Sequence, residues 1–214
     1  GPKKWKKLLS KISANYNSLD DINVYNSFIH DLIVDVTGVK REKIHHMDHH
    51  QCHAAYAYWA SPIRGENTLI MTADAYGDGK STTLSTIGAS GGIAVQHEVD
   101  ANEFQLGRIY RSITLLMGMM PDAHEFKVMG MAPYTKEPIM RNAYNVFKKG
   151  MYVDGLNFKY DERPSDLFFY FKERLEQSRF GGIAGALQQY SEDILLDYTK
   201  NAIAKYNCDK LVFS

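Results

Sequence analysis

Three short strand patterns joined by glycine-bearing turns constrain the fold of this chain more than any other feature. The strand patterns cover residues 68–74, 81–87 and 93–99. The connections at 76–79 and 90–92 are short and rich in glycine. Turns of this length join neighbouring strands that run in opposite directions. The segment therefore predicts a three-stranded antiparallel meander.

Segments with apolar residues at helical spacing lie on both sides of this meander. We expect helices at 3–12, about 21–36, 49–59, 104–119, 137–149, 167–177 and 183–206. Asp48 is placed to cap the helix that begins at His49. A hairpin at 152–160 and a final strand at 210–214 complete the pattern. The order predicts an α/β domain with a mixed sheet flanked by helices.

The charge balance and the cysteine content exclude several classes of protein. Lys and Arg total 25, and Asp and Glu also total 25, which argues against a generally basic nucleic-acid binder. Two cysteines, Cys52 and Cys208, do not make a disulfide scaffold. The sequence has no apolar run of the roughly eighteen residues that a membrane span requires. We therefore expect a cytoplasmic protein with no membrane segment.

Both ends of the sequence have features that are unusual for natural chain termini. Gly1-Pro2 is typical of the scar that remains when a tag is removed by a protease. The pattern at 210–214 is that of a buried strand, whereas chain ends usually lie in solvent. We expect a piece of a longer protein.

A histidine cluster precedes the first strand pattern. Five of the eight histidines lie within nine residues: His45, His46, His49, His50 and His53. On a helix, His49 and His53 are four residues apart and share one face, as two nitrogen ligands of one metal ion must. His46 and His50 have the same spacing, so the spacing does not select the pair. Packing of the imidazoles without metal is the alternative. The zinc-peptidase motif His-Glu-x-x-His is absent, because His50 stands where the glutamate would be.

Asp74 and the turn after it form a second candidate site. Asp74 closes an apolar strand, and a carboxylate in that position requires partners, such as a metal ion. The turn 76–79 can present backbone N–H groups to phosphate oxygens. The alternative is that Gly77-Asp78-Gly79 is an ordinary turn.

Residues 124–134 form a third candidate site. Glu125 and Lys127 lie close to Gly130 and Pro133 in a segment that predicts neither helix nor strand. Such a loop can become ordered against a nucleotide or an acyl phosphate. A surface ion pair is the alternative.

Five stretches together resemble the nodulation-type O-carbamoyltransferase family. They are IHHMDHHQCHAAYAYWASP at 44–62, TLIMTADAYGD at 68–78, GRIYRSITLLMG at 107–118, EFKVMGMAPY at 125–134 and the helix and strand at 184–214. The resemblance implies the fold of actin, heat-shock ATPases and sugar kinases, which has two similar α/β halves. In those terms residues 3–62 are the helical end of the first half. Residues 63–214 are the core of the second half, truncated at its C-terminus.

The resemblance also implies an activity. Members of this family form carbamoyl-adenylate from carbamoyl phosphate and ATP in a separate domain. The domain resembled here then transfers the carbamoyl group to a hydroxyl of a small molecule, at a metal held by histidines and aspartates. The implied partners are the adenylate, a small hydroxyl acceptor and the missing remainder of the same polypeptide. A homo-oligomer is compatible with this picture, and the truncated chain alone is expected to be inactive.

The family's site residues carry over to matching positions. His49, His53 and Asp74 match the ligands of a divalent metal, iron or zinc, and His50 is a candidate catalytic base. Nucleotide or phosphate contacts match Tyr76, Gly77, Asp78, Gly79 and Lys127. The sequence departs from the family at Ala75, Phe126 and Thr135, where glycine is usual, and this puts the geometry of the nucleotide loop in question.

Two other functions remain open at this point. An enzyme that transfers a threonylcarbamoyl group to tRNA would share the fold and the His-x-x-x-His pair, but the neutral charge balance and the match at 125–134 argue against it. A non-catalytic fragment that binds nucleotide or metal is the second alternative.

Overall fold

The computed structural model describes residues 19–214. The expected tag scar at 1–2 and the expected helix at 3–12 lie outside the described residues. The chain divides into two compact units, Gly1–Met47 and Asp48–Ser214. The expected division at residues 62 and 63 into parts of two halves stays a prediction.

The described part of the first unit is a helix followed by a single helical turn. Helix α2 (Leu19–Thr37) is the helix expected at about 21–36, and η1 (Arg41–Lys43) follows it. Gly38 ends α2 with φ of +70° and donates its N–H to the Val34 carbonyl at 2.9 Å. Arg41 forms an ion pair with Asp31 and donates to Ser27 Oγ at 2.8 Å. These contacts fasten η1 to α2.

The second unit contains the sheet and the remaining helices. Its elements are α3 (His49–Trp59), β1 (Thr68–Gly77), β2 (Lys80–Ile87), β3 (Ile93–Asp100), α4 (Leu106–Leu116), α5 (Glu125–Met131), η2 (Ala132–Tyr134), α6 (Glu137–Gly150), β4 (Tyr152–Asp154), β5 (Asn157–Lys159), α7 (Leu167–Leu175), α8 (Phe180–Tyr206) and β6 (Lys210–Phe213). The helices expected in this unit are all present. None of the helices described between residues 19 and 214 combines the length and the apolar character that crossing a bilayer requires.

The prediction that residues 124–134 form a loop is wrong. Glu125–Met131 forms helix α5, and η2 continues from it. Gly130 and Pro133 suggested a break in the helical pattern. Pro133 instead lies in the first turn of η2, where proline's missing N–H costs nothing because that N–H would have no helical partner.

The main sheet has four strands in the order β3-β2-β1-β6. The pairs β1–β2 and β2–β3 are antiparallel, but β6 pairs with β1 in parallel, with Leu69 opposite Leu211. A three-stranded antiparallel meander is therefore the wrong description of the sheet. The long helix α8 returns the chain to the β1 edge in the same direction, and a parallel pair requires such a crossover. The fold is mixed α/β, and its assignment to the actin-like superfamily stays a prediction.

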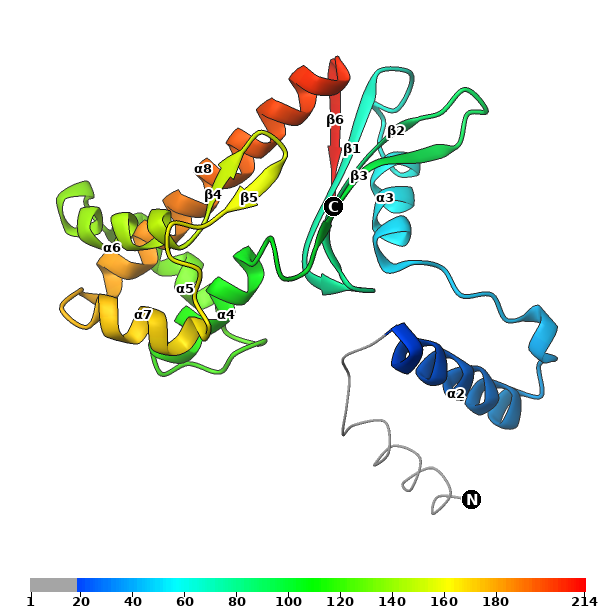
Figure 1. The fold of residues 1–214 in the computed structure, drawn as a ribbon, viewed down its shortest axis with the longest axis horizontal. Helices are drawn as coiled ribbons and strands as arrows, with labels where there is room; N and C mark the ends of the chain where they lie inside the picture. The colour runs from blue at the N-terminus through cyan, green and yellow to red at the C-terminus, as the bar shows by residue number, and fades with distance from the viewer. Residues whose placement is uncertain (1–18) are drawn as a thin grey trace. The chain divides into compact units, whose positions relative to one another are not determined.

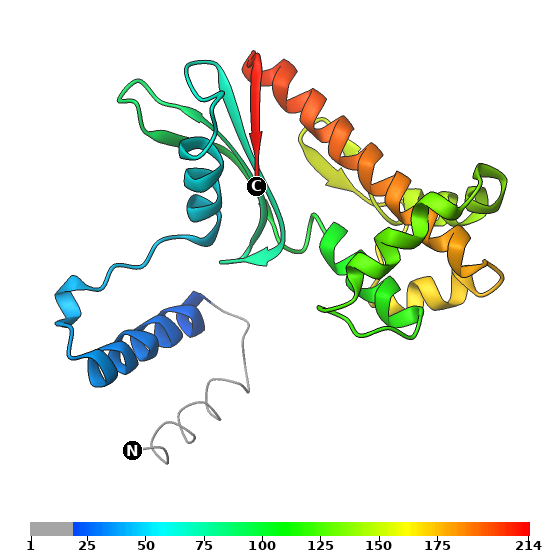
Figure 2. The ribbon, with the colours of Figure 1, turned by 180° about the vertical axis from the view of Figure 1, so that it is seen from behind.

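Helices cover both faces of the sheet, as Figures 1 and 2 show. Side chains alternate along β1, so Leu69 and Met71 belong to the larger core formed with α4–α8. Ile70 faces the other way and packs with Ala54 and Tyr58 of α3 and with Val212 of β6. Because β1 is buried on both faces, its first five residues have almost no exposure to solvent. Asp74 lies in the second half of this strand, which ends at Gly77 and leads into the turn to β2.

We expect truncation of Leu84 to be costly, because its side chain is fully buried in the larger core. Leu84→Ala should lower the free energy of unfolding by about 2–5 kcal/mol, as measured by urea denaturation. Leu115→Ala is the matched control, since Leu115 is 47% exposed on α4. The control should cost less than about 1 kcal/mol. Equal losses for the two variants would contradict the assignment of Leu84 to the core.

Candidate metal site

Helix α3 begins at a network of charged side chains. Asp48 caps the helix as predicted, accepting the Gln51 N–H at 3.0 Å. Lys80 Nζ lies 3.0 Å from Asp48 and 2.6 Å from Glu98, and thereby joins α3 to β2 and β3. Partial burial raises the pKa of Asp48, but the Gln51 N–H and Lys80 outweigh it and leave the pKa below its ordinary value. The start of α3 is therefore fixed against the sheet.

The structure brings His49, His53 and Asp74 together. His49 Nε2 lies 2.6 Å from Asp74 Oδ2, and His53 Nε2 lies 3.2 Å from His49 Nε2 and 3.7 Å from Asp74 Oδ2. The three ligand atoms all lie within 4.8 Å of one another. The sequence spacing left two histidine pairs open, and of these it is His49 and His53 that approach the carboxylate. The His50 side chain is directed at Thr72 instead.

Asp74 lies in a setting that keeps it ionised. Partial burial raises its pKa, but the hydrogen bonds from His49 and the Ala75 N–H, with the charge of both histidines, outweigh it and lower the pKa overall. Its side chain is 37% exposed, so the carboxylate is reachable from solvent. A metal ligand must be deprotonated, and Asp74 meets that condition at neutral pH.

Ser214 orients the His53 ring, and the sequence analysis did not identify it. Its Oγ lies 2.9 Å from His53 Nδ1, which leaves Nε2 to face Asp74. The Ser214 backbone is paired with β1, donating to the Met71 carbonyl at 3.1 Å and accepting from the Ala73 N–H at 2.9 Å. Metal-binding histidines commonly use the second ring nitrogen in this way. A hydroxyl after a strand pattern is a weak signal, and only the parallel pairing with β1 reveals it.

His50 occupies a different environment from His49 and His53. It is 1% exposed, and its Nδ1 lies 2.8 Å from Thr72 Oγ1, which in turn lies 2.9 Å from Thr83 Oγ1. Burial lowers the pKa of His50. The ring is enclosed between α3 and the sheet, so its placement favours a structural role. The expected role as a catalytic base stays a prediction that this burial does not favour.

The donor set suits a divalent metal ion. Two imidazole nitrogens and one carboxylate oxygen are ligands that iron and zinc accept. At bond lengths of about 2.0–2.2 Å, tetrahedral ligand atoms lie roughly 3.3–3.6 Å apart, and the observed separations of 2.6, 3.2 and 3.7 Å bracket that range. The side chains are 37–40% exposed, which leaves room for a further ligand. The residues therefore fit the group that the sequence predicts.

The turn expected to contact phosphate lies beside these histidines. Asp78 and Gly79 have φ of +49° and +83° and form the two-residue connection between β1 and β2. Asp78 Oδ2 accepts the His49 N–H at 2.8 Å. Tyr76 is exposed, with the Arg108 guanidinium 5.8 Å from its ring centroid. The turn is thus adjacent to the histidine cluster.

Lys127 does not belong to that cluster. It lies on α5, where its side chain is exposed and its Nζ is 5.8 Å from the Phe126 ring centroid. Helix α5 packs against α4, α8 and η2. The expected phosphate contacts of the turn and of Lys127 stay predictions.

A cavity of about 480 Å³ opens beside Asp74. Its apolar wall includes Phe104, Leu106, Leu195 and Phe213, and its polar groups include Tyr110, Arg111, Asp122, Glu125, Gln188 and Glu192. The volume is within the usual range for sites that bind small molecules. Residues of β1, α4, α5, α8 and β6 contribute to it, so no single stretch of sequence predicts it.

Hydrogen bonds order the polar side of this cavity. Arg111 Nε contacts both Asp122 oxygens at 3.0 Å. The Tyr110 hydroxyl donates to Gln188 Oε1 at 2.6 Å, and Gln188 donates to Glu192 Oε1 at 2.8 Å. Burial raises the pKa of Tyr110 to about 12, so its hydroxyl remains a donor at neutral pH. These groups can bind the polar substituents of a ligand.

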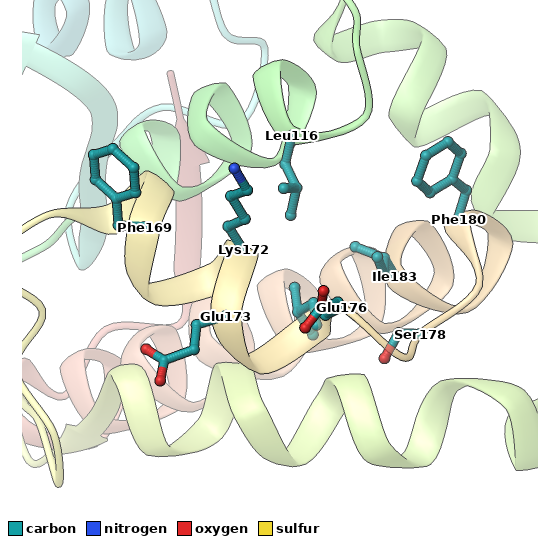
Figure 3. A pocket seen from close by; sticks show the side chains of 9 residues that line it. Leu116, Phe169, Lys172, Glu173, Glu176, Ser178, Phe180 and Ile183 are labelled. Carbon is teal, nitrogen blue, oxygen red and sulfur yellow. The ribbon is translucent and has the colours of Figure 1, made fainter.

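A second cavity of about 490 Å³ lies between α4, α7 and the start of α8. Figure 3 shows it with Leu116 of α4, Lys172 of α7 and Ile183 of α8 around it. None of His49, His53 and Asp74 lines it, whereas Asp74 lines the first cavity. The cavity beside Asp74 is therefore the better candidate for a ligand site.

Comparison with known proteins identifies related sequences. The sequence pattern of one family, described as carbamoyltransferase N-terminus, matches residues 3–214. An uncharacterized protein of Methanocaldococcus jannaschii is 25% identical over 229 aligned residues, which cover 98% of this chain and 36% of that protein. An uncharacterized protein of Synechocystis is 31% identical over 87 residues, which cover 41% of this chain and 14% of that protein. The chain thus spans about a third of the first relative and a smaller part of the second.

We expect the Ser214 hydroxyl to support metal binding through His53. Ser214→Ala should weaken divalent metal affinity roughly 10–100-fold, because the His53 ring loses the contact that orients it. Isothermal titration calorimetry with Zn²⁺ measures this. Ser90→Ala, in the exposed turn between β2 and β3, is the control and should bind like the wild type. Wild-type affinity in Ser214→Ala would show that the hydroxyl does not orient His53.

Proposed function

The chain belongs to the carbamoyltransferase N-terminus family, and from that premise we propose that it is the transfer domain of an O-carbamoyltransferase. The proposal depends on one observation above all. The ligand atoms of His49, His53 and Asp74 lie within 4.8 Å of one another, and Asp74 also lines a cavity large enough for a small molecule. A metal-ligand set beside a ligand cavity is the arrangement that metal-assisted group transfer requires.

The proposed reaction transfers a carbamoyl group from carbamoyl-adenylate to a hydroxyl. A bond forms between the acceptor oxygen and the carbamoyl carbon, and the bond from that carbon to the adenylate phosphate oxygen breaks. The products are a carbamate ester, AMP and one proton. Negative charge develops on the carbamoyl oxygen, and a divalent ion, iron or zinc, supplies Lewis-acid stabilisation of it when bound. His49, His53 and Asp74 would hold that ion.

The cavity beside Asp74 suits the acceptor better than the phosphate of the donor. Its walls carry the carboxyl groups of Asp74, Asp122, Glu125 and Glu192 but one guanidinium, Arg111. Each of these carboxylates has a partner: Asp74 contacts His49, Asp122 pairs with Arg111, Glu125 accepts the Asp122 N–H and Glu192 accepts from Gln188. Four carboxylates against one guanidinium leave the cavity with an excess of negative charge. This charge disfavours an anion and favours a neutral or cationic acceptor. The apolar wall would contact its carbon skeleton.

The donor would be produced elsewhere in a longer protein. The Methanocaldococcus relative is about three times as long as the stretch matched here. We propose that such an additional region forms carbamoyl-adenylate from carbamoyl phosphate and ATP. The domain described here would receive the adenylate and an acceptor hydroxyl.

Elemental analysis of the purified chain tests the metal site. We expect close to one iron or zinc per chain after reconstitution, and its loss in His53→Ala because one of the three ligands is gone. His30→Ala, on α2, is the matched control and should retain the metal. Equal metal content in all three proteins would argue against the site.

Ligand binding tests the transfer function separately. A non-hydrolysable analogue of carbamoyl-adenylate should bind to the metal-loaded chain and bind much more weakly to the metal-free chain, as measured by calorimetry. Metal binding without any affinity for the analogue would contradict the proposed donor while leaving the metal site intact. Tight, specific binding of tRNA at physiological salt would instead support the threonylcarbamoyl alternative.

A further inference from the structure

The turn between β1 and β2 contacts the residue that begins the metal-binding helix. Gly77 lies directly against the His49 ring. A Cβ placed on Gly77 would be 2.0 Å from His49 Cδ2, 2.5 Å from Cγ and 2.8 Å from Nε2. All three are atoms of the imidazole that approaches Asp74. No side chain at position 77 can coexist with the observed position of this ring.

The backbone conformation does not explain a glycine at position 77. Its φ is not among the positive values, unlike that of Gly79, which is +83°. A Cβ on Gly79 would meet no atom within 4 Å. Gly79 is therefore suited to its position by backbone conformation, whereas Gly77 is suited to its position by the space that His49 occupies.

Asp78 contacts the same histidine through its backbone. Its Oδ2 accepts the His49 N–H at 2.8 Å. The first N–H groups of a helix have no partner within the helix, so an external acceptor is needed there. A carboxylate at that end also interacts favourably with the helix dipole. Asp78 thus holds the backbone of His49 while Gly77 leaves room for its side chain.

These contacts leave the turn poorly suited to bind a phosphate. Asp48 and Asp78 already place two carboxylates at the start of α3, and Asp74 lies close by. Lys80 is the cation at this end of the helix, and it is already paired with Asp48 and Glu98. A phosphate approaching here would therefore meet mainly like charge. The observed contacts of the turn are directed at His49 instead.

We propose that Gly77 and Asp78 are positioning residues for His49, so that this turn holds the imidazole in place for the metal ion. The inference rests on the metal site of the proposed function. It assigns to the turn a role in arranging the ligands rather than in binding nucleotide.

Titration of the 214-residue chain with Co²⁺ tests the role of Gly77. Visible absorption of bound Co²⁺ reports the ligand arrangement, which a loss of stability alone would not change. Gly77→Ala should weaken Co²⁺ binding roughly 10–100-fold and alter the spectrum. Gly79→Ala is the matched control: it strains the same turn but has no contact with His49, so its affinity and spectrum should remain those of the wild type.

The substitutions of Asp78 provide a second test should Gly77→Ala fail to fold. The substitution Asp78→Asn keeps a side-chain oxygen that can accept the His49 N–H, and asparagine tolerates the left-handed backbone. This variant should therefore bind Co²⁺ nearly as well as the wild type, whereas Asp78→Ala should bind more weakly. Equal losses in Asp78→Asn and Asp78→Ala would overturn the positioning role of Asp78, because they would show that its charge is what matters.

The outcomes separate this inference from the function on which it rests. A wild-type chain that binds Co²⁺ no better than His53→Ala overturns the metal site and the inference together. A wild-type chain that binds Co²⁺ normally, with Gly77→Ala showing the same affinity and spectrum, overturns the inference alone.

Discussion

The packing of α3 against β1 and β6 is the interaction on which the candidate site depends. Ala54 and Tyr58 pack on Ile70 and Val212, with His50 in the same buried row of the helix. His49 and His53 form the adjacent row, one position earlier along the helix. Burial of one row therefore places the other at the margin of the interface, beside the end of β1. The same contact gives the two imidazoles both their access to solvent and their fixed orientation.

Polar contacts then refine what the apolar packing places approximately. Ser214 bonds to His53, Asp78 holds the backbone of His49, and Asp48 caps the helix and pairs with Lys80. The supporting residues come from the end of β6, from the β1–β2 turn and from β2, so several strands contribute to one ligand set. Such an arrangement is stiff because each contact constrains a different part of α3. The cavity beside Asp74 lies on the side of β1 opposite to α3, where α4 and α8 pack.

Local patterns predicted most of the elements and, together with the family resemblance, the three residues that converge in the candidate site. Helical spacing gave α3, α4, α6, α7 and α8, and alternation with glycine turns gave β1, β2 and β3. The i, i+4 spacing offered two histidine pairs, His49 with His53 and His46 with His50, since that geometry is a property of the helix itself. The family resemblance then selected His49 and His53. The prediction failed at α5, because Gly130 and Pro133 resemble breakers although Pro133 falls in a helical first turn. The prediction of the sheet also failed, because the sequence of a strand does not specify which other strand pairs with it.

The sequence by itself determined the periodic elements, the neutral charge balance, the clustering of histidines and a resemblance that the family match now supports. These are local properties, set by side-chain spacing and composition. Only the tertiary structure decided that β6 lies parallel to β1, which brings Ser214 to His53 across 161 positions of sequence. It also decided that His50 is buried while His49 faces Asp74, and that the His49 imidazole occupies the space where a side chain at position 77 would lie. Contacts between distant segments depend on how whole elements pack, and no window of neighbouring residues contains that information.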